Sequence, residues 1–255
     1  MKALSLFSGI GGIDLAAEWA GIETVAFCER DPFCQRVLAK HWPNIPIYDD
    51  VCTLTKERLD EDGIGTVDLI FGGYPCQPFS IAGQREGAND DRHLWPEVKR
   101  ILQEVNHRWF IGENVGGHVS MGLDTVLSDL ESINHTWETF IIPACAIDAP
   151  HRRDRVFIVG HVSDSSGIGH QGIERLRQDN RQIESWRKSA LRSASKLFNG
   201  VDWKKRAKQS GFLGTNDGIP DRMDRIRACG NAVVPNQIYP ILAAIKQIDD
   251  MLQAV

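Results

Sequence analysis

A cysteine enclosed by prolines is the residue in this 255-residue sequence whose setting most favours chemistry. Cys76 lies in the run GGYPCQPFS (72–80), directly after a predicted strand. Folds that alternate strands and helices bind ligands at the carboxyl ends of their strands, and a thiolate is a strong nucleophile once its pKa is lowered. Because Pro75 and Pro78 hold it in a rigid loop, we interpret Cys76 as a candidate nucleophile. We interpret four other cysteines as buried structural thiols: Cys28, Cys34, Cys52 and Cys145.

A glycine-rich turn, LFSGIGG (6–12), lies between the first predicted strand and a helix. Glycines let the backbone approach a ligand, and the amino end of a helix offers unpaired N–H groups. Glu29 ends the second predicted strand, where an acid accepts hydrogen bonds from ribose hydroxyls, and Asp50 follows the third strand, within reach of an adenine amino group. These residues predict nucleoside binding without deciding between NAD and S-adenosylmethionine. A tight structural turn is the alternative.

An acid and two arginines complete the set. Glu113, in GENV (112–115), ends the fifth predicted strand on the same edge as Cys76. It can hold or donate a proton if burial raises its pKa, and a helix cap or an ion pair is the alternative. Arg153 and Arg155 lead into the seventh predicted strand and can grip a carboxylate, a phosphate or a carbonyl oxygen, the alternative being a salt-bridged strand edge.

The elements that must position these residues alternate between strands and helices over the first 160 residues. We predict strands over Ala3–Phe7, Thr24–Cys28, Pro46–Tyr48, Val67–Phe71, Trp109–Gly112, Thr136–Ile142 and Arg155–Val162. Apolar residues at three- and four-residue steps predict helices over Ile13–Trp19, Pro32–His41, Leu94–Val105 and Leu123–Ile133, with a last helix from about Asn236 to Leu252. This order predicts a doubly wound, mainly parallel sheet.

One basic segment interrupts an otherwise acidic chain. Residues 161–210 hold 11 Lys and Arg against 5 Asp and Glu, a local charge of +6, whereas the rest of the chain carries −11. Such segregation indicates a polyanionic partner met by one face, and a solvated loop is the alternative. We expect one domain from residues 1–160 and 222–255, with residues 161–221 as a small insert.

Composition excludes several classes of protein. The chain is 42% hydrophobic and 25% charged, with a net charge of −5, as in ordinary globular proteins. No apolar run approaches the roughly 18 residues that cross a bilayer, and the first residues do not form a signal peptide. The six cysteines include no Cys-x-x-Cys pair, so we expect neither a disulfide framework nor a zinc site, and a cytoplasmic location.

Five blocks, in this order, resemble the C5-cytosine DNA methyltransferase family. They are FSGIGG (7–12), GYPCQPFS (73–80), ENV (113–115), RDR (153–155) and GNAVVP (230–235), and the resemblance covers about residues 3–160 and 222–250. It implies a Rossmann-like S-adenosylmethionine-dependent methyltransferase fold with a seven-stranded, mainly parallel sheet. The insert then becomes a target-recognition region, short for the family.

The resemblance also implies a role for each block. Cys76 would add to C6 of a flipped-out cytosine and make C5 nucleophilic. Glu113 would bond the N3 edge and exocyclic amine, and Arg153 and Arg155 would hold the O2 side. The methyl donor S-adenosylmethionine, which leaves as S-adenosylhomocysteine, would be bound without any metal by Phe7, Ser8, Gly9, Ile10, Gly11, Gly12, Glu29, Arg30, Asp50, Val51, Gly73, Pro75, Leu94, Asn231, Ala232 and Val233.

The implied partner is duplex DNA. We expect a monomer in the bacterial cytoplasm or nucleoid, encoded by host or phage, with no membrane contact and a cognate restriction endonuclease as a second candidate partner. The expected DNA contacts come from the loop after Cys76 and from insert lysines suited to phosphates: Gln77, Ser80, Gln84, Arg85, Lys204, Lys205 and Lys208.

Three other functions compete with this interpretation. An RNA cytosine methyltransferase would use the same blocks. A non-catalytic DNA-binding protein would have no use for Cys76, Glu113 and both arginines. A nicotinamide-dependent dehydrogenase would explain only the glycine-rich turn and Glu29.

Overall fold

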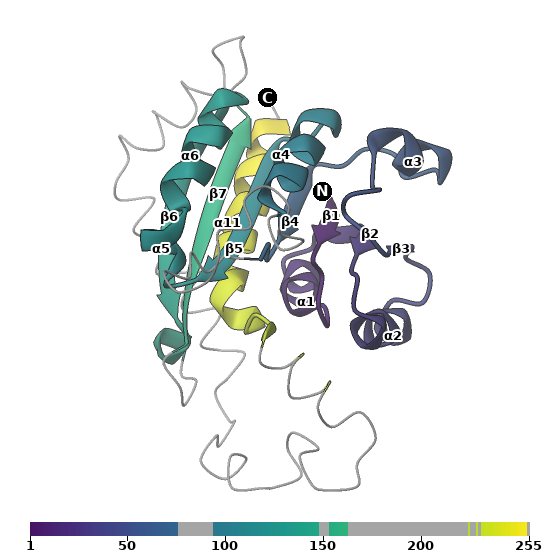
Figure 1. Cartoon of the computed structure of the whole chain (residues 1–255), viewed down its shortest axis with the longest axis horizontal. Coiled ribbons are helices and arrows are strands. Elements are labelled where there is room, and N and C mark those ends of the chain that lie inside the picture. Colours follow the sequence, from purple (N-terminus) through teal and green to yellow (C-terminus); the bar gives the residue numbers. More distant parts are fainter. Residues whose placement is uncertain (76–93, 148–152, 163–223, 225–227, 229–230, 254–255) are drawn as a thin grey trace, which may run out of the picture.

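A single seven-stranded sheet organises the structure, a computed structural model that describes residues 1–75, 94–147, 153–162, 224, 228 and 231–253. The strand order is β3-β2-β1-β4-β5-β7-β6 (Figure 1). The strands are β1 (Lys2–Leu6), β2 (Glu23–Cys28), β3 (Ile47–Tyr48), β4 (Leu69–Gly72), β5 (Trp109–Val115), β6 (His135–Pro143) and β7 (Asp154–Val162). All seven predicted strands are confirmed, with ends that differ by up to three residues.

Strand direction sets where the ends of the strands meet. β1 pairs in parallel with β2 and β4, as do β2 with β3 and β4 with β5. β7 runs antiparallel to both of its neighbours, β5 and β6. The sheet is therefore mainly parallel, as predicted, with β7 alone reversed among the described strands. This reversal brings the amino end of β7 to the edge at which the other strands end.

Helices cover both faces of the sheet (Figure 1). On one face, α4 (Trp95–Glu104) and α6 (Leu123–Ser132) share an apolar core with Leu4, Ile70 and Phe110. On the other, α1 (Gly12–Trp19) and α11 (Pro235–Gln253) pack on Leu69, Ile111 and Phe157. The remaining described elements are α2 (Pro32–His41), α3 (Lys56–Glu61), α5 (His118–Met121) and the 3-10 helix η1 (Ala144–Ile147).

Several predictions need correction. Cys52 and Cys145 are exposed, so the interpretation of all four cysteines as buried thiols holds only for Cys28 and Cys34. The short helices α3 and α5 and the turn η1 were not predicted, because four to six residues carry too little periodicity. The expected insert, residues 161–221, lies outside the described residues except for His161 and Val162. None of the helices in the described part of the chain has the length and apolarity to span a membrane.

A buried carboxylate ties the last helix to the middle of the sheet. Asp249, in α11, is 3% exposed and accepts hydrogen bonds from Nε and Nη2 of Arg108, both 2.8 Å long, and from Nε1 of Trp109 at 3.0 Å. Burial acts to raise the pKa of Asp249, but the bonds from Arg108 and Trp109 outweigh it and hold this pKa below its ordinary value. The expected return of the last helix onto the sheet is confirmed.

We expect Asp249→Asn to lower the free energy of unfolding by about 2 kcal/mol, because it leaves Arg108 with a weaker partner in a partly buried site. Urea denaturation at pH 7 measures this. Asp250→Asn is the matched control: Asp250 is exposed and pairs with Lys246, so its loss should cost no more than about 0.5 kcal/mol. The difference in free energy of unfolding between wild type and Asp249→Asn should shrink as the pH falls below about 4. A carboxyl group with a lowered pKa stabilises the fold only while it is ionised, and it becomes protonated in this range. Equal losses in both variants would contradict this role.

Candidate functional site

Those predicted catalytic and cofactor residues that the structure describes gather at one edge of the sheet. The segments that follow β1, β2, β3 and β4 all leave at the carboxyl edge, and β5 ends there. Because β7 is reversed, Arg153 and Arg155 enter at this same edge. The turn 231–234, before α11, also lies there, since a Cβ on Gly12 would be 2.6 Å from the carbonyl oxygen of Val233. Segments far apart in sequence thus converge as predicted.

The glycine-rich turn has a backbone that few side chains allow. Phe7, Gly9 and Gly11 have φ values of 50°, 55° and 81°, in the left-handed region that favours glycine. A Cβ on Gly11 would lie 2.5 Å from the ring of Trp42, so only glycine fits between the turn and the end of α2. The turn is therefore shaped for close packing as well as for backbone exposure.

Glu29 is fixed beside this turn. Its Oε2 accepts a hydrogen bond from the N–H of Gly9 and its Oε1 one from the N–H of Asp31, both 2.7 Å long. An ionised carboxylate has about four acceptor positions, so about two remain for a ligand. Glu29 is half-buried, at the end of β2. Its geometry suits a site for a vicinal diol.

The other predicted cofactor residues differ in exposure. Asp50 is half-buried and its Oδ1 accepts from the N–H of Cys52 at 2.9 Å, while the buried Val51 presents its carbonyl to Arg100. Three of the predicted cofactor residues are exposed: Arg30, Pro75 and Asn231. Five others are half-buried, namely Ser8, Ile10, Gly73, Leu94 and Ala232, whereas Val233 is buried.

Glu113 is a buried acid with a partner across the sheet. It lies inside β5, not after it, and Arg155 of β7 is its diagonal neighbour on the same face. Nε of Arg155 is 2.7 Å from Oε1 of Glu113, as an ion pair whose N–H is not aligned with the oxygen. Burial raises the pKa of Glu113 to about 7, while the charges of Arg155 and Arg153 act to lower it. Glu113 can therefore hold a proton near neutral pH.

The segment before Cys76 approaches this acid closely. A Cβ on Gly73 would lie 2.6 Å from Oε2 of Glu113, so glycine is required there for the carboxylate to keep its position. One residue on, the carbonyl of Tyr74 accepts a hydrogen bond of 3.1 Å from Nδ2 of the buried Asn114. Gly73 and Tyr74 therefore lie beside the Glu113 segment, and the position of Cys76 itself stays a prediction.

Arg153 is held by the segment at the start of α11. Its backbone has a φ of 34°, and its Nη2 donates to the carbonyl of Ala232. The fully buried Gln237 donates from Nε2 to the carbonyls of Ile142, at 2.7 Å, and of Arg153, at 3.0 Å. Sequence analysis missed Gln237, although a glutamine among the apolar residues of a packed helix stripe is a usable signal.

A second missed residue lies under the glycine-rich turn. Asp14, in α1, is 1% exposed and accepts hydrogen bonds of 3.1 Å from the hydroxyls of Ser5 and Thr24. Oγ of Ser5 is also 2.9 Å from Oγ of Ser8, in the turn itself. Burial raises the pKa of Asp14 to about 7, against the effect of these hydrogen bonds. An acid inside an apolar helical stripe could have flagged this position.

Eight of the predicted site residues lie outside the described ranges, so their positions stay predictions. They are the nucleophile candidate and the seven expected DNA contacts: Cys76, Gln77, Ser80, Gln84, Arg85, Lys204, Lys205 and Lys208. Within the described ranges, no group of three or more His, Cys, Asp or Glu side chains is placed to hold a metal ion.

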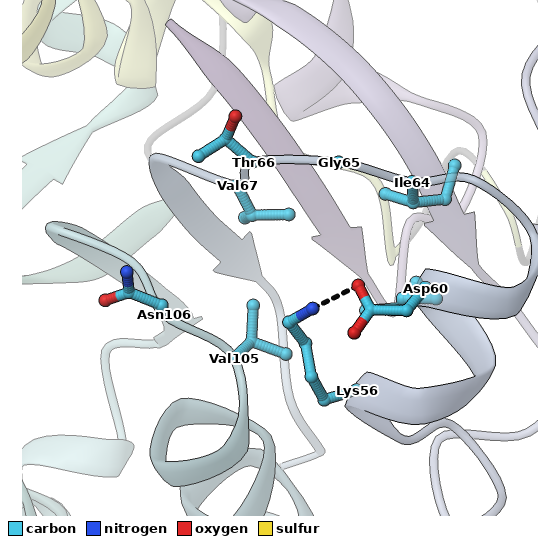
Figure 2. Close-up of a pocket in the computed structure, with 9 residues that line it drawn as sticks. Lys56, Asp60, Ile64, Gly65, Thr66, Val67, Val105 and Asn106 are labelled. Carbon is cyan, nitrogen blue, oxygen red and sulfur yellow. Dashed lines mark hydrogen bonds and ion pairs between the residues drawn. The ribbon is translucent and has the colours of Figure 1, made fainter.

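A pocket of about 230 Å³ lies at the opposite edge of the sheet (Figure 2). Thr66 and Val67, which precede β4, and Asn106, which precedes β5, line it together with α3. Figure 2 shows Lys56 turned toward Asp60, its ion-pair partner. Because the pocket is at the amino ends of the strands, it is separate from the site built around Glu113.

The family model and the curated relatives that match this chain indicate the same family. The family model for C-5 cytosine-specific DNA methylase matches residues 1–203. Similar curated proteins include the type II methyltransferases M2.BsuMI of Bacillus subtilis, 33% identical over 168 residues, and M.AquIA of Picosynechococcus sp., 32% identical over 177 residues. These alignments cover 62% and 63% of this chain, and 41% and 71% of the respective relatives. The chain therefore spans less than half of M2.BsuMI.

Solved structures show the same fold. DNMT2 of Spodoptera frugiperda has a TM-score of 0.55 at 24% identity, covering 64% of this chain and 50% of that one. A protein described as a DNA modification methyltransferase, encoded within prophage Cp of E. coli, has a TM-score of 0.54 at 25% identity, with 64% and 47% covered. The expected seven-stranded methyltransferase fold is thereby confirmed.

We expect Asp14→Asn to be more stable than wild type at pH 8, on the order of 3 kcal/mol, because an amide needs no proton to stay neutral. The carboxyl pKa rises from about 3.9 in an unfolded chain to about 7 here, so its contribution is complete below pH 4 and is lost as the pH rises through 7. Chemical denaturation from pH 5 to pH 8 measures this. The exposed Asp124, changed to Asn, is the control. Parallel stability curves for wild type and Asp14→Asn would contradict the assignment.

Proposed function

The chain belongs to the C-5 cytosine-specific DNA methylase family, and from this premise we propose that it transfers a methyl group from S-adenosylmethionine to C5 of cytosine in duplex DNA. The observation that supports this most directly is the placing of Glu113. A buried acid with a pKa near 7, paired with Arg155, lies beside Gly73, three residues before the candidate nucleophile Cys76. A cytosine that reacts with a thiol needs such a proton-bearing acid and such arginines around it.

The residues around the glycine-rich turn fit S-adenosylmethionine. Glu29 has acceptor positions left for the two ribose hydroxyls, and Asp50 follows β3 on the same edge, where an adenine amino group can be met. Gly9, where a Cβ would meet no atom within 4 Å, leaves room for close approach of the methionine part. When bound, S-adenosylmethionine supplies an electrophilic methyl group and leaves as S-adenosylhomocysteine.

In the proposed reaction, the Cys76 thiolate adds its electron pair to C6 of cytosine, which makes C5 nucleophilic. Glu113 holds a proton toward N3 and so stabilises the charge that develops as the C6 bond forms. Arg155, which pairs with Glu113, presents positive charge on the O2 side of the cytosine. Arg153, held by the carbonyl of Ala232, does the same. After C5 is methylated, a base removes the C5 proton, the C5–C6 double bond re-forms, and the Cys76 sulfur leaves with its electron pair.

DNA would be held by segments outside this core. The target atom cannot be reached inside a duplex, so the base must flip out, at a cost of a few kcal/mol. We assign closure over the base to the loop 77–92, and phosphate contacts to the basic insert 161–221 with Lys204, Lys205 and Lys208. The catalytic and cofactor-binding unit would comprise residues 1–160 and 222–255.

The test is transfer of labelled methyl from S-adenosylmethionine to unmethylated duplex DNA, with an RNA of the same sequence in parallel. We expect label in DNA, and we expect Cys76→Ala to lower turnover at least about 10⁴-fold because the thiol supplies the covalent step. Binding of S-adenosylmethionine, measured by calorimetry, should stay within about twofold, since the thiol acts on the base and not on the methyl donor.

The control is Cys145→Ala, because Cys145 is an exposed cysteine that has no role in the proposed reaction. Full activity of Cys76→Ala would overturn the covalent mechanism. Label only in RNA would overturn the substrate, and label in neither nucleic acid would overturn the activity of this chain on its own.

A second prediction concerns Gly73. We expect Gly73→Ala to lower methyl transfer at least about tenfold, because the new Cβ would displace the Glu113 carboxylate from its place beside Arg155. Gly65→Ala is the control, since no atom lies within 4 Å of the Cβ it would add. Initial rates with saturating DNA, together with thermal unfolding of both variants, separate a displaced acid from an unfolded protein. Equal rates for the two variants would show that the Glu113 position is not needed.

A further inference from the structure

Tyr74 joins the segment that carries Cys76 to the segment that carries Glu113, through both its backbone and its side chain. Its carbonyl accepts the hydrogen bond from Asn114, the residue after Glu113. Its hydroxyl is 2.9 Å from Nε2 of His118, five residues after Glu113. The tyrosine therefore contacts the Glu113 segment at two separated points, which fixes orientation as well as position.

Tyr74 and His118 lie in a buried and closely packed part of the protein. Tyr74 is 3% exposed and His118 is 4% exposed, so their hydrogen bond is shielded from water. The tyrosine ring packs on Trp95, with centroids 5.0 Å apart, and meets His118 edge-on at 5.5 Å. It also lies over Gly112, where a Cβ would be 3.0 Å from Cε1 of the ring. A phenylalanine would fill the same space, so packing alone does not require the hydroxyl.

We propose that Tyr74 and His118 are positioning residues, which hold the Cys76 segment at a fixed distance and angle from Glu113. This inference rests on the proposed function, because it assigns the pair to the alignment of a nucleophile and an acid on one base. A misplacement of about 1 Å in a catalytic group costs on the order of a hundredfold in rate. The hydroxyl thus matters more for the rate of the folded enzyme than for its stability.

The test compares Tyr74→Phe with Tyr48→Phe. Tyr48 is also 3% exposed and its hydroxyl donates to Asp62 at 2.8 Å, so the two variants lose the same chemical group from similar burial. We expect Tyr74→Phe to lower kcat at least about tenfold, with KM for DNA and binding of S-adenosylmethionine within about twofold. Tyr48→Phe should keep the wild-type kcat. A wild-type kcat in Tyr74→Phe would overturn the proposal.

Changes at His118 separate positioning from packing. His118→Gln keeps an acceptor for the hydroxyl and should keep more of the rate than His118→Leu, which keeps only bulk. The double variant with Tyr74→Phe and His118→Leu should lose no more rate than the worse single variant, since both remove one interaction. Fully multiplied losses in the double variant would show two independent packing defects and would overturn the pairing.

A readout without DNA distinguishes this proposal from the proposed function. Alkylation of Cys76 by iodoacetamide, followed by mass spectrometry of its peptide, should be about fivefold faster in Tyr74→Phe, the change that loss of one buried hydrogen bond makes in an opening equilibrium. If wild type methylates no nucleic acid but this change is seen, the proposed function fails and the positioning of Cys76 stands. An unchanged alkylation rate would overturn the positioning role, whatever the methylation assay gives.

Discussion

The buried carboxylate of Glu113 is the group around which the rest of the site is arranged. At 7% exposure it cannot remain charged without a nearby cation, and Arg155 of β7 and Arg153, just before that strand, supply this positive charge. Both arginines lie at this edge because β7 runs against its neighbours. A parallel strand in the same place would carry Arg155 to the opposite edge. The reversed strand is thus a requirement of the site and not only a feature of the fold.

The segment 231–237, which is not part of the sheet, contacts the sheet edge that carries Glu113. Gly12 lets the carbonyl of Val233 lie against α1, and Gln237 bonds the carbonyls at the ends of β6 and β7. At its other end the same helix is fixed by Asp249 to Arg108, at the amino end of β5. A helix fixed at both ends gives the first turn of α11 a defined position relative to Arg153. This explains why residues near position 235 belong to a site whose other parts precede position 160.

Sequence reasoning identified the strands and the conspicuous acids, because β-branched runs, glycine turns and acids at strand ends leave local signals. It assigned Glu29 to a nucleoside site from the residues themselves, and the family resemblance assigned Glu113 to the reacting base. The structure places both at the carboxyl edge of the sheet. It missed Asp14, Gln237 and the Tyr74–His118 pair. Each of these acts through a contact between residues distant in sequence, and neither spacing nor composition encodes which side chain a buried hydroxyl or amide will meet. The function of Cys76 and of the insert rests on the family resemblance.

The pKa of Glu113 is a balance that the surrounding elements can shift. Burial raises it to about 7, against the effect of the two arginines, whose charges act to lower it. Near this value, a small change in the distance of either guanidinium decides whether the carboxyl holds its proton at neutral pH. Arg153 is held by Ala232 and Gln237, which belong to the end of the chain. The position of Arg153, and with it the pKa of Glu113, therefore depends on contacts made by the last segment of the chain.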